Sequence, residues 1–283
     1  MGSGAARGPT LFTVVGPGRV GSALAQALEA RGLLAGPVIR RRGLEWADAP
    51  SGRRPVLLCT GAQHLAAAVA ECPQDRRADL VFMQNGAIEP WLAAQGLEAT
   101  ATRALLYLAA AEGGRGGLRD GGGLSIASGP WAAETRLALG AAGVAAREVP
   151  REEFARLAFR KLLWSSIFWC LSAGRGGAPV GELVRDLDSR EEVEALACEL
   201  LAVGGPAYGL CGDDEEELVT DLVDYSLSIP HAVPSVPMAL EELPWRNGFF
   251  LRRCRSPLHL AALRRALPDA DFRTALTRPG GPP

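Results

Sequence analysis

A glycine-rich motif near the start of the chain constrains its fold more than any other feature. Residues 16–21 read GPGRVG and fit the pattern G-x-G-x-x-G. Residues 10–15 before the motif are apolar and β-branched, and apolar residues at helical spacing follow it from 20 to 28. In a strand–turn–helix unit, the first glycine makes the turn, the second admits a pyrophosphate and the third allows close helix packing. The motif therefore predicts a dinucleotide site at Gly16, Pro17, Gly18, Arg19, Val20 and Gly21, and a purely structural glycine turn is the alternative.

Short apolar runs alternate with helical patterns through the first half of the chain. Strands are predicted at 37–40, 55–60 and 80–83, and a helix at 63–70. Residues 105–126 contain a glycine-rich stretch between two apolar segments, which is typical of a hairpin. This alternation predicts an α/β fold, with a Rossmann-type parallel sheet that carries helices on both faces.

The second half of the chain is predicted to be helical. Helices are expected at 151–173, 189–203, 213–228 and 249–267, and the second of these opens with a capping-box pattern at Ser189 and Glu192. We therefore expect a dinucleotide-binding Rossmann domain over residues 1–150 and an all-helical substrate domain over residues 151–283. The active site is expected in the cleft between them.

Composition excludes several classes of function. The net charge is −2 and the isoelectric point is near 6.0, so the chain lacks the positive charge that attracts nucleic acid. The N-terminus lacks the apolar stretch of a secretory signal, and the longest apolar run is about half of a bilayer span. Six scattered cysteines form no ligand pattern. We expect a cytoplasmic protein with reduced thiols, no metal and no membrane partner.

The end of the second predicted strand indicates which dinucleotide is bound. An NAD site usually has an acidic residue about 20 positions after the glycines, where this chain has Arg40, Arg41 and Arg42. Guanidinium groups bind a 2′-phosphate through charge-assisted hydrogen bonds. The arginines favour NADP(H), and the alternative is a solvated loop with Glu45 as a late acidic partner for NAD(H).

A single lysine stands out among the basic residues. Of 30 Lys and Arg residues, 29 are arginine and one is Lys161. The lysine lies in a predicted helix and shares a face with Ser165 and Trp169. Because lysine donates a proton near neutral pH far more readily than arginine, its retention favours a functional role. Chance retention of a lysine that extends to solvent is the alternative.

Four segments together resemble the ketopantoate reductase (2-dehydropantoate 2-reductase) family. They are GPGRVG at 16–21, QNG at 84–86, RKLLWS at 160–165 and ELPWRNGFFLRR at 242–253. Their order and separation suit that family over nearly the whole chain. The resemblance implies NADPH-dependent reduction of a 2-keto acid, such as 2-dehydropantoate, to the 2-hydroxy acid.

The resemblance also implies roles for individual residues. Lys161 would be the general acid, Glu242 would bind the substrate hydroxyl, and Asn85 would lie beside nicotinamide and substrate. Thr60 and Gly61 would contact the cofactor, and Ser165, Trp169 and Ser235 would contact the substrate. The structural alternatives are an exposed helix-end carboxylate for Glu242 and a turn residue with left-handed backbone for Asn85.

The chain departs from the family at several positions. Ser165 and Trp169 stand where the family usually has asparagines, and the loop from Ser235 to Glu242 is shorter than usual. A lysine or similar group expected after the strand at 55–60 is absent from the sequence, which has residues 61–63 (GAQ) there instead. The reaction class therefore transfers better than the substrate. An NADPH reductase of the same fold for another ketone or imine, and a non-catalytic NADP(H) sensor, are the alternatives. A homodimer is a further expectation, with a contact face at residues 258–267.

Overall fold

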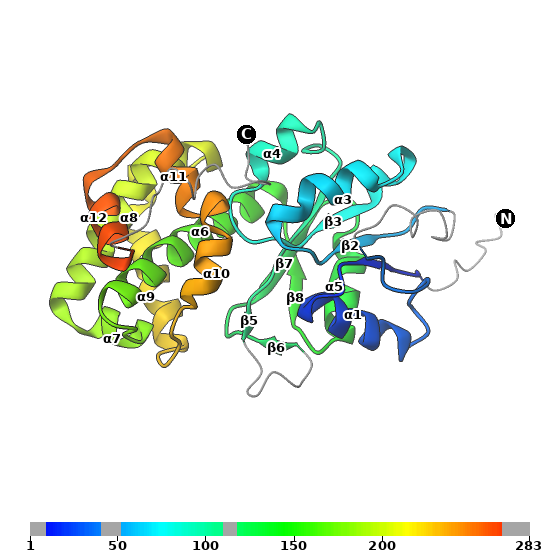
Figure 1. The fold of residues 1–283 in the computed structure, drawn as a ribbon, viewed down its shortest axis with the longest axis horizontal. Helices are drawn as coiled ribbons and strands as arrows, with labels where there is room; N and C mark the ends of the chain where they lie inside the picture. Colours follow the sequence, from blue (N-terminus) through cyan, green and yellow to red (C-terminus); the bar gives the residue numbers. More distant parts are fainter. Residues whose placement is uncertain (1–9, 41–51, 110–117, 268–283) are drawn as a thin grey trace. The chain divides into compact units, whose positions relative to one another are not determined.

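The computed structural model describes residues 10–40, 52–109 and 118–267, and the chain divides into two compact units (Figure 1). Unit 1 comprises Met1–Gln84, Leu92–Asp120 and Leu124–Val149. Unit 2 comprises Asn85–Trp91, Gly121–Gly123 and Pro150–Pro283. Two short segments of unit 2 therefore come from the first half of the sequence.

Unit 1 is built on a six-stranded sheet in the order β1-β2-β3-β4-β7-β8. Only the β4–β7 pair is antiparallel, and a separate two-stranded ribbon pairs β5 with β6. Strands β1 to β4 and β7 are buried along their length, as expected for strands covered on both faces. The strands are β1 (Thr13–Val15), β2 (Val56–Leu58), β3 (Leu80–Phe82), β4 (Thr102–Leu105), β5 (Leu108–Ala109), β6 (Arg119–Asp120), β7 (Ser125–Ser128) and β8 (Ala146–Glu148).

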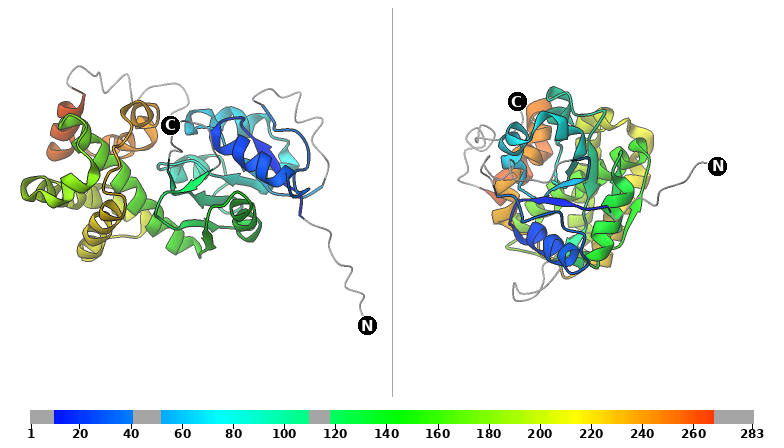
Figure 2. Two further views of the ribbon diagram at one scale, coloured as in Figure 1. Left: turned by 90° about the horizontal axis from the view of Figure 1, so that it is seen from below. Right: turned by 90° about the vertical axis from the view of Figure 1, so that its right-hand side faces the viewer.

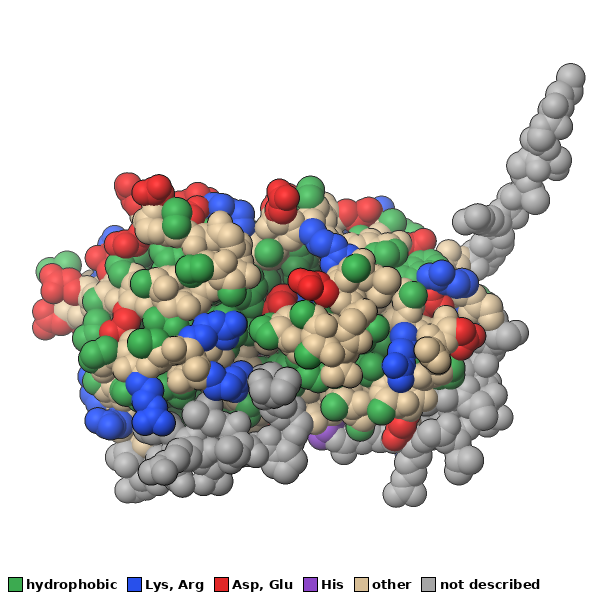
Figure 3. All heavy atoms as spheres, turned by 90° about the horizontal axis from the view of Figure 1, so that it is seen from above, with side chains coloured by type: hydrophobic (Ala, Val, Ile, Leu, Met, Phe, Trp, Pro, Cys, Tyr) green, Lys and Arg blue, Asp and Glu red, His purple; other side chains and the backbone are tan. Residues whose placement is uncertain are grey.

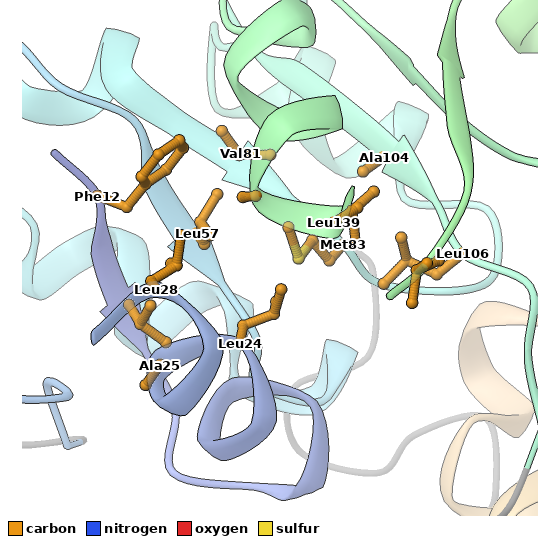
Figure 4. Close-up of a cluster of buried hydrophobic side chains, with 13 residues drawn as sticks. Phe12, Leu24, Ala25, Leu28, Leu57, Val81, Met83, Ala104, Leu106 and Leu139 are labelled. Carbon is orange, nitrogen blue, oxygen red and sulfur yellow. The ribbon is translucent and has the colours of Figure 1, made fainter. Parts of the chain in front are cut away.

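Helices cover both faces of this sheet. On one face, α1 (Arg19–Glu29) packs beside α5 (Ala132–Ala141) over the core in Figure 4, which includes Leu28, Leu57 and Leu139. Leu58 points to the opposite face by strand alternation and is also buried. The second face is covered by the 3-10 turn η1 (Ala62–His64) and the helix α3 (Leu65–Glu71). The 3-10 turn η2 (Gln74–Asp79) follows α3 in the sequence, and the helix α4 spans Glu89–Ala94. The predicted Rossmann-type sheet is confirmed.

Several details of unit 1 differ from the predictions. The strand expected at 37–40 is reduced to one isolated bridge, Val15 with Ile39, and a second bridge before it pairs Phe12 with Leu34. The hairpin predicted over 105–126 is present as the β4–β7 and β5–β6 pairs, although part of its tip lies outside the described residues. The helix α5 and strand β8 were not predicted, because the alanine-rich segment before β8 has only weak amphipathic periodicity.

In unit 2 the described residues form helices and no strand, which confirms the predicted helical part. The long helix α6 contacts most of the others and has thirteen buried residues, since neighbours cover it on several sides (Figure 2). The helices are α6 (Arg151–Gly174), α7 (Val180–Arg185), α8 (Leu187–Gly204), α9 (Glu215–Ser228), α10 (Val236–Glu241), α11 (Asn247–Arg253) and α12 (Pro257–Ala266), with 3-10 turns η4 (Gly205–Tyr208), η5 (Gly212–Asp214) and η6 (Leu243–Trp245).

Two predicted helix boundaries in unit 2 are wrong. Asp186, rather than Ser189, caps α8, and its carboxylate accepts hydrogen bonds from the backbone N–H and the hydroxyl of Ser189. The helix expected over 249–267 is two helices, because Pro257 starts a new one after an extended break. Within α12, Ala262 and Leu263 are buried in the protomer. These two residues of the segment suggested for dimer contact are therefore used inside unit 2, whereas Leu258 is exposed.

Charged side chains of both signs are interspersed on the face shown in Figure 3. In the described part of the chain, no single helix is long and apolar enough to cross a membrane. The bent pair Leu187–Tyr208 and Gly212–Ser228 reaches that length and composition only when its two halves are taken together.

Candidate active site

The three glycines of the first turn differ in how closely other atoms surround them. Gly16 has φ +100°, and a Cβ there would lie 2.9 Å from Cγ2 of Thr60. A Cβ on Gly21 would lie 1.9 Å from the carbonyl oxygen of Gly16, so only glycine lets α1 approach the turn. A Cβ on Gly18, by contrast, would meet no heavy atom within 4 Å. The space beside Gly18 is therefore open, which is compatible with the role that the motif assigns to the second glycine.

The N-terminus of α1 suits an anionic ligand. Gly18 is its N-cap and provides no side-chain cap, and the first turn contains no acidic residue. Pro17, Gly18 and Arg19 are exposed, and Val20 is half-buried. Backbone N–H groups at such a helix start, together with the helix dipole, attract phosphate. The residues present therefore fit the pyrophosphate of a dinucleotide.

Unsatisfied polar atoms gather at the end of β2. The buried side chain of Gln84 donates from Nε2 to the carbonyl oxygens of Leu58 (2.9 Å) and Thr60 (3.0 Å). Among the described residues, Oε1 of Gln84, Oγ1 of Thr60 and Oε1 of Gln63 are buried and have no hydrogen-bond partner. A Cβ on Gly61 would lie 2.5 Å from Oε1 of Gln63. These atoms fit a ligand rich in hydroxyl and amide groups, and sequence reasoning missed both glutamines.

The residues predicted to bind a 2′-phosphate are only partly described. Arg40 is exposed and directly follows the bridge at Ile39, whose carbonyl oxygen accepts a hydrogen bond from the N–H of Gly16. Arg40 is therefore connected to the glycine turn through one backbone contact. Arg41 and Arg42 lie outside the described residues.

In unit 2, the single lysine meets the predicted asparagine. Lys161 is half-buried near the middle of α6, and its Nζ donates to Oδ1 of Asn85 at 2.9 Å. The left-handed residue of the turn is Gly86, with φ +86°, and no described residue other than glycine has positive φ. The turn-residue alternative for Asn85 is therefore wrong, and its side chain is instead engaged with the lysine.

Tight backbone packing fixes this turn. The N–H of Ala87 donates to the carbonyl oxygen of Trp245 at 2.7 Å. A Cβ on Gly86 would lie 2.6 Å from the same oxygen, so the close approach requires glycine. The contact joins the Asn85 turn to η6, which lies between Glu242 and Arg246 in the sequence.

Glu242 and Arg246 form an ion pair beside the lysine. Their side chains are only 17% and 13% exposed, so the exposed-carboxylate alternative for Glu242 is wrong. Glu242 is also the C-cap of α10, so its carboxylate lies at the end of a helix. Sequence reasoning did not select Arg246, although its position four residues after Glu242 allows a pair.

The surroundings of Lys161 bring its proton chemistry to neutral pH. Burial lowers the pKa of the ammonium group most, the positive charge of Arg246 lowers it further, and Glu242 partly opposes both, with a result of about 7. Burial disfavours the charged form of a lysine, and a neighbouring cation acts in the same direction. A lysine with such a pKa can give up and regain a proton at neutral pH.

The remaining predicted substrate residues lie outside this hydrogen-bonded cluster. The hydroxyl of Ser165 donates to the carbonyl oxygen of Leu162 within α6. Trp169 is 1% exposed, and its indole N–H donates to Oδ1 of Asn247 at 2.7 Å in the helical core. Ser235 is exposed and caps α10 by accepting from the N–H of Met238. Their substrate roles stay predictions.

Comparison with solved structures shows which known folds this architecture resembles. A ketopantoate reductase of the PanE/ApbA family from Ralstonia eutropha is 20% identical, with a TM-score of 0.64, and the match covers 90% of this chain and 97% of that one. The chain has the ketopantoate reductase fold. The resemblance seen in the four sequence segments is confirmed at this level.

Two further structures widen the comparison. A D-mandelate dehydrogenase in complex with NADH is 15% identical, with a TM-score of 0.66 and coverage of 91% and 97%. A dimeric ketopantoate reductase from Staphylococcus aureus is 13% identical, with a TM-score of 0.61 and coverage of 94% and 98%. No protein-family model and no curated protein matches the sequence.

Proposed function

We propose that the chain is an NADPH-dependent reductase that converts a 2-keto acid to a 2-hydroxy acid. The observation that carries the proposal is the half-buried Lys161 held by Asn85, with a pKa of about 7. Solved structures of the same fold include a ketopantoate reductase and a D-mandelate dehydrogenase, which supports an oxidoreductase acting on a hydroxyl or keto carbon.

In this reaction, Lys161 supplies the proton. When bound, a reduced nicotinamide would supply the hydride, and the keto oxygen would then carry negative charge. The Lys161 ammonium stabilises that charge and then transfers a proton to the oxygen, which completes the hydroxyl. Asn85 orients the ammonium by accepting one of its hydrogens, and Glu242 accepts from the new hydroxyl.

Turnover assays test the reaction class and the substrate together. NADPH oxidation is followed by absorbance with ketopantoate, pyruvate and an aryl 2-keto acid, the last because of the D-mandelate dehydrogenase structure. We expect turnover with at least one of them. NADPH binding without oxidation by any keto acid or ketone would support the non-catalytic sensor instead.

The choice of NADPH rests on the arginines at 40–42. Guanidinium groups favour the 2′-phosphate that only NADP(H) carries. We expect kcat/KM to be higher with NADPH than with NADH, and an Arg40→Ser variant to lose activity with NADPH while keeping its activity with NADH. A parent enzyme that prefers NADH, the nucleotide in the D-mandelate dehydrogenase structure, would refute this choice without affecting the reaction class.

We further propose a cytoplasmic homodimer. The dimeric Staphylococcus aureus reductase supports the assembly state. Sedimentation equilibrium should give twice the protomer mass of 29.8 kDa, and a protomer mass at micromolar concentration would refute the dimer. Cell fractionation tests the location.

A further inference from the structure

We infer that Arg246 binds the carboxylate of the substrate and makes the site selective for monoanionic 2-keto acids over neutral ketones. The inference rests on the proposed function and adds to it a residue that determines specificity. The position, the unused donors and the charge of the Arg246 side chain support this role.

The position of Arg246 is fixed by the same contacts that fix the lysine. Its preceding residue, Trp245, accepts from the N–H of Ala87, two residues after Asn85. Asn85 in turn accepts from Lys161. The charge of Arg246 also lowers the pKa of Lys161, as expected for a cation close to the ammonium group. Arg246 therefore belongs to the same cluster as the proposed proton donor.

The guanidinium group of Arg246 retains an unused donor. One terminal nitrogen pairs with Glu242, which leaves the other N–H groups of a side chain that has five. Its Nε is buried, and no atom of the described residues accepts its hydrogen. A buried N–H without an acceptor is costly, and a carboxylate is the strongest acceptor that a guanidinium group can meet. An oxygen-bearing ligand would supply the acceptor for this N–H, and an anionic ligand is favoured.

The charge balance of the cluster points to one negative charge on that ligand. Lys161 and Arg246 contribute two positive charges when the lysine is protonated, and Glu242 contributes one negative charge. A substrate with one carboxylate neutralises the remainder. A neutral ketone leaves Nε unpaired and the excess charge uncompensated, so it binds less well.

A purely structural role for Arg246 gives a different expectation. If the arginine only orients Glu242, its removal disturbs the binding of acids and of their neutral amides alike, because both present the same keto group. If it binds the carboxylate, the loss is confined to the acids. The ratio between the two ligands therefore separates the roles.

The test compares Arg246→Gln and Arg246→Lys with the parent in the presence of NADPH. The probes are oxamate, an unreactive carboxylate analogue of a 2-keto acid, and oxamide, its neutral counterpart, with affinities measured by calorimetry. We expect Arg246→Gln to weaken oxamate binding roughly 10- to 100-fold while oxamide changes little, and Arg246→Lys to fall between. The exposed Arg255→Gln serves as the matched control and should behave like the parent.

Equal losses for oxamate and oxamide, or unchanged oxamate binding, would overturn the role of Arg246 in carboxylate binding. If Arg246→Gln does not fold, the milder Arg246→Lys, judged by the same ratio after its melting temperature is checked, decides the question. The parent protein could also bind oxamate in an Arg246-dependent way and yet reduce no keto acid. That result would support the carboxylate-binding role of Arg246 and refute the proposed reaction.

Discussion

Lys161 combines two properties that are rarely found together in one side chain. It is the only lysine among 30 basic residues, and it donates to Asn85 from a half-buried position. An arginine there would keep the charge but could not release a proton near neutral pH. We therefore expect the lysine to matter for proton transfer more than for attraction of the substrate.

Replacement of Lys161 should separate chemistry from cofactor binding. Lys161→Ala should reduce kcat roughly 10²- to 10⁴-fold, because the proton donor is lost. Affinity for NADPH, measured by fluorescence titration, should be unchanged, since the glycine turn is intact. Lys161→Arg, which keeps the charge, should be nearly as slow. A kcat within a few-fold of the parent would remove the proposed role.

The pH dependence of reduction follows from the lowered pKa of Lys161. With a pKa of about 7, the ammonium form of Lys161, which is the proposed proton donor, predominates below pH 7 and declines above it. The rate of reduction should therefore fall as pH rises through about 7, provided that proton transfer limits turnover. Arg246→Gln should move this midpoint to higher pH, because one cause of the depression is removed. A flat profile from pH 6 to 9, which runs from about one unit below the midpoint to about two units above it, would contradict the assignment.

Individual site residues were predictable from the sequence to different extents. Lys161 was identifiable by its uniqueness, and Asn85 and Glu242 by the resemblance. Arg246 was not identifiable, because it lies in an irregular segment whose direction depends on the contact between Trp245 and Ala87. Local periodicity carries no information about such a long-range contact.

Among the secondary-structure elements, the first strand–turn–helix unit offers a sharp test. Gly21→Ala would place a Cβ 1.9 Å from the carbonyl oxygen of Gly16, whereas Gly18→Ala meets nothing within 4 Å. Gly18 also has φ −69°, which alanine adopts readily. We expect Gly21→Ala to lower the melting temperature clearly, and Gly18→Ala to keep it while weakening NADPH binding. Equal melting temperatures for the two variants would argue against the packing role of the third glycine.

Elements with strong periodic signals were predicted well, and those that depend on tertiary contacts were not. The buried strands β2 and β3 and the long helix α6 lie where their apolar runs indicate. The helix α10 was missed, since it is only six residues long and lies in a proline-rich stretch. Its cap, Ser235, was instead interpreted as a substrate residue.

Across the whole molecule, stability should depend on a buried histidine in unit 2. His259 is 1% exposed, and its Nε2 lies 2.9 Å from Nδ2 of Asn247, which also donates to the carbonyl oxygen of Ser166. Because the amide nitrogen can only donate, Nε2 accepts, and the ring carries its hydrogen on Nδ1. Burial lowers the pKa of His259 from 6.5 to about 4. The folded state therefore holds this histidine in its neutral form.

The lowered pKa of His259 should make the folded state less stable as the pH falls. Between pH 6.5 and 4 the unfolded chain binds a proton at this residue that the folded chain does not. The contribution of His259 to the free energy of unfolding should therefore be fully present above pH 6.5 and fall by about 3 kcal/mol as pH drops to 4. Urea unfolding across this range measures the loss. His259→Leu should remove this component, while the exposed His231→Gln should retain it. An unchanged slope in His259→Leu would exclude His259 as its source.

The fold-level outcome was predictable because the glycine motif and the change to helical periodicity near residue 150 are local signals. The assignment of Asn85–Trp91 and Gly121–Gly123 to unit 2 was not, since it depends on packing between distant parts of the chain. The solved structures confirm the architecture, and the turnover assays identify the substrate.

The interleaved boundaries of the two units restrict how the protein can be divided. A fragment that starts at Pro150 carries Lys161, Glu242 and Arg246 but lacks Asn85 and the turn that contacts Trp245. The helical unit therefore cannot be fused to another nucleotide-binding domain as one continuous segment. Any hybrid enzyme made from it would also have to include the seven-residue segment Asn85–Trp91 from the first half of the sequence.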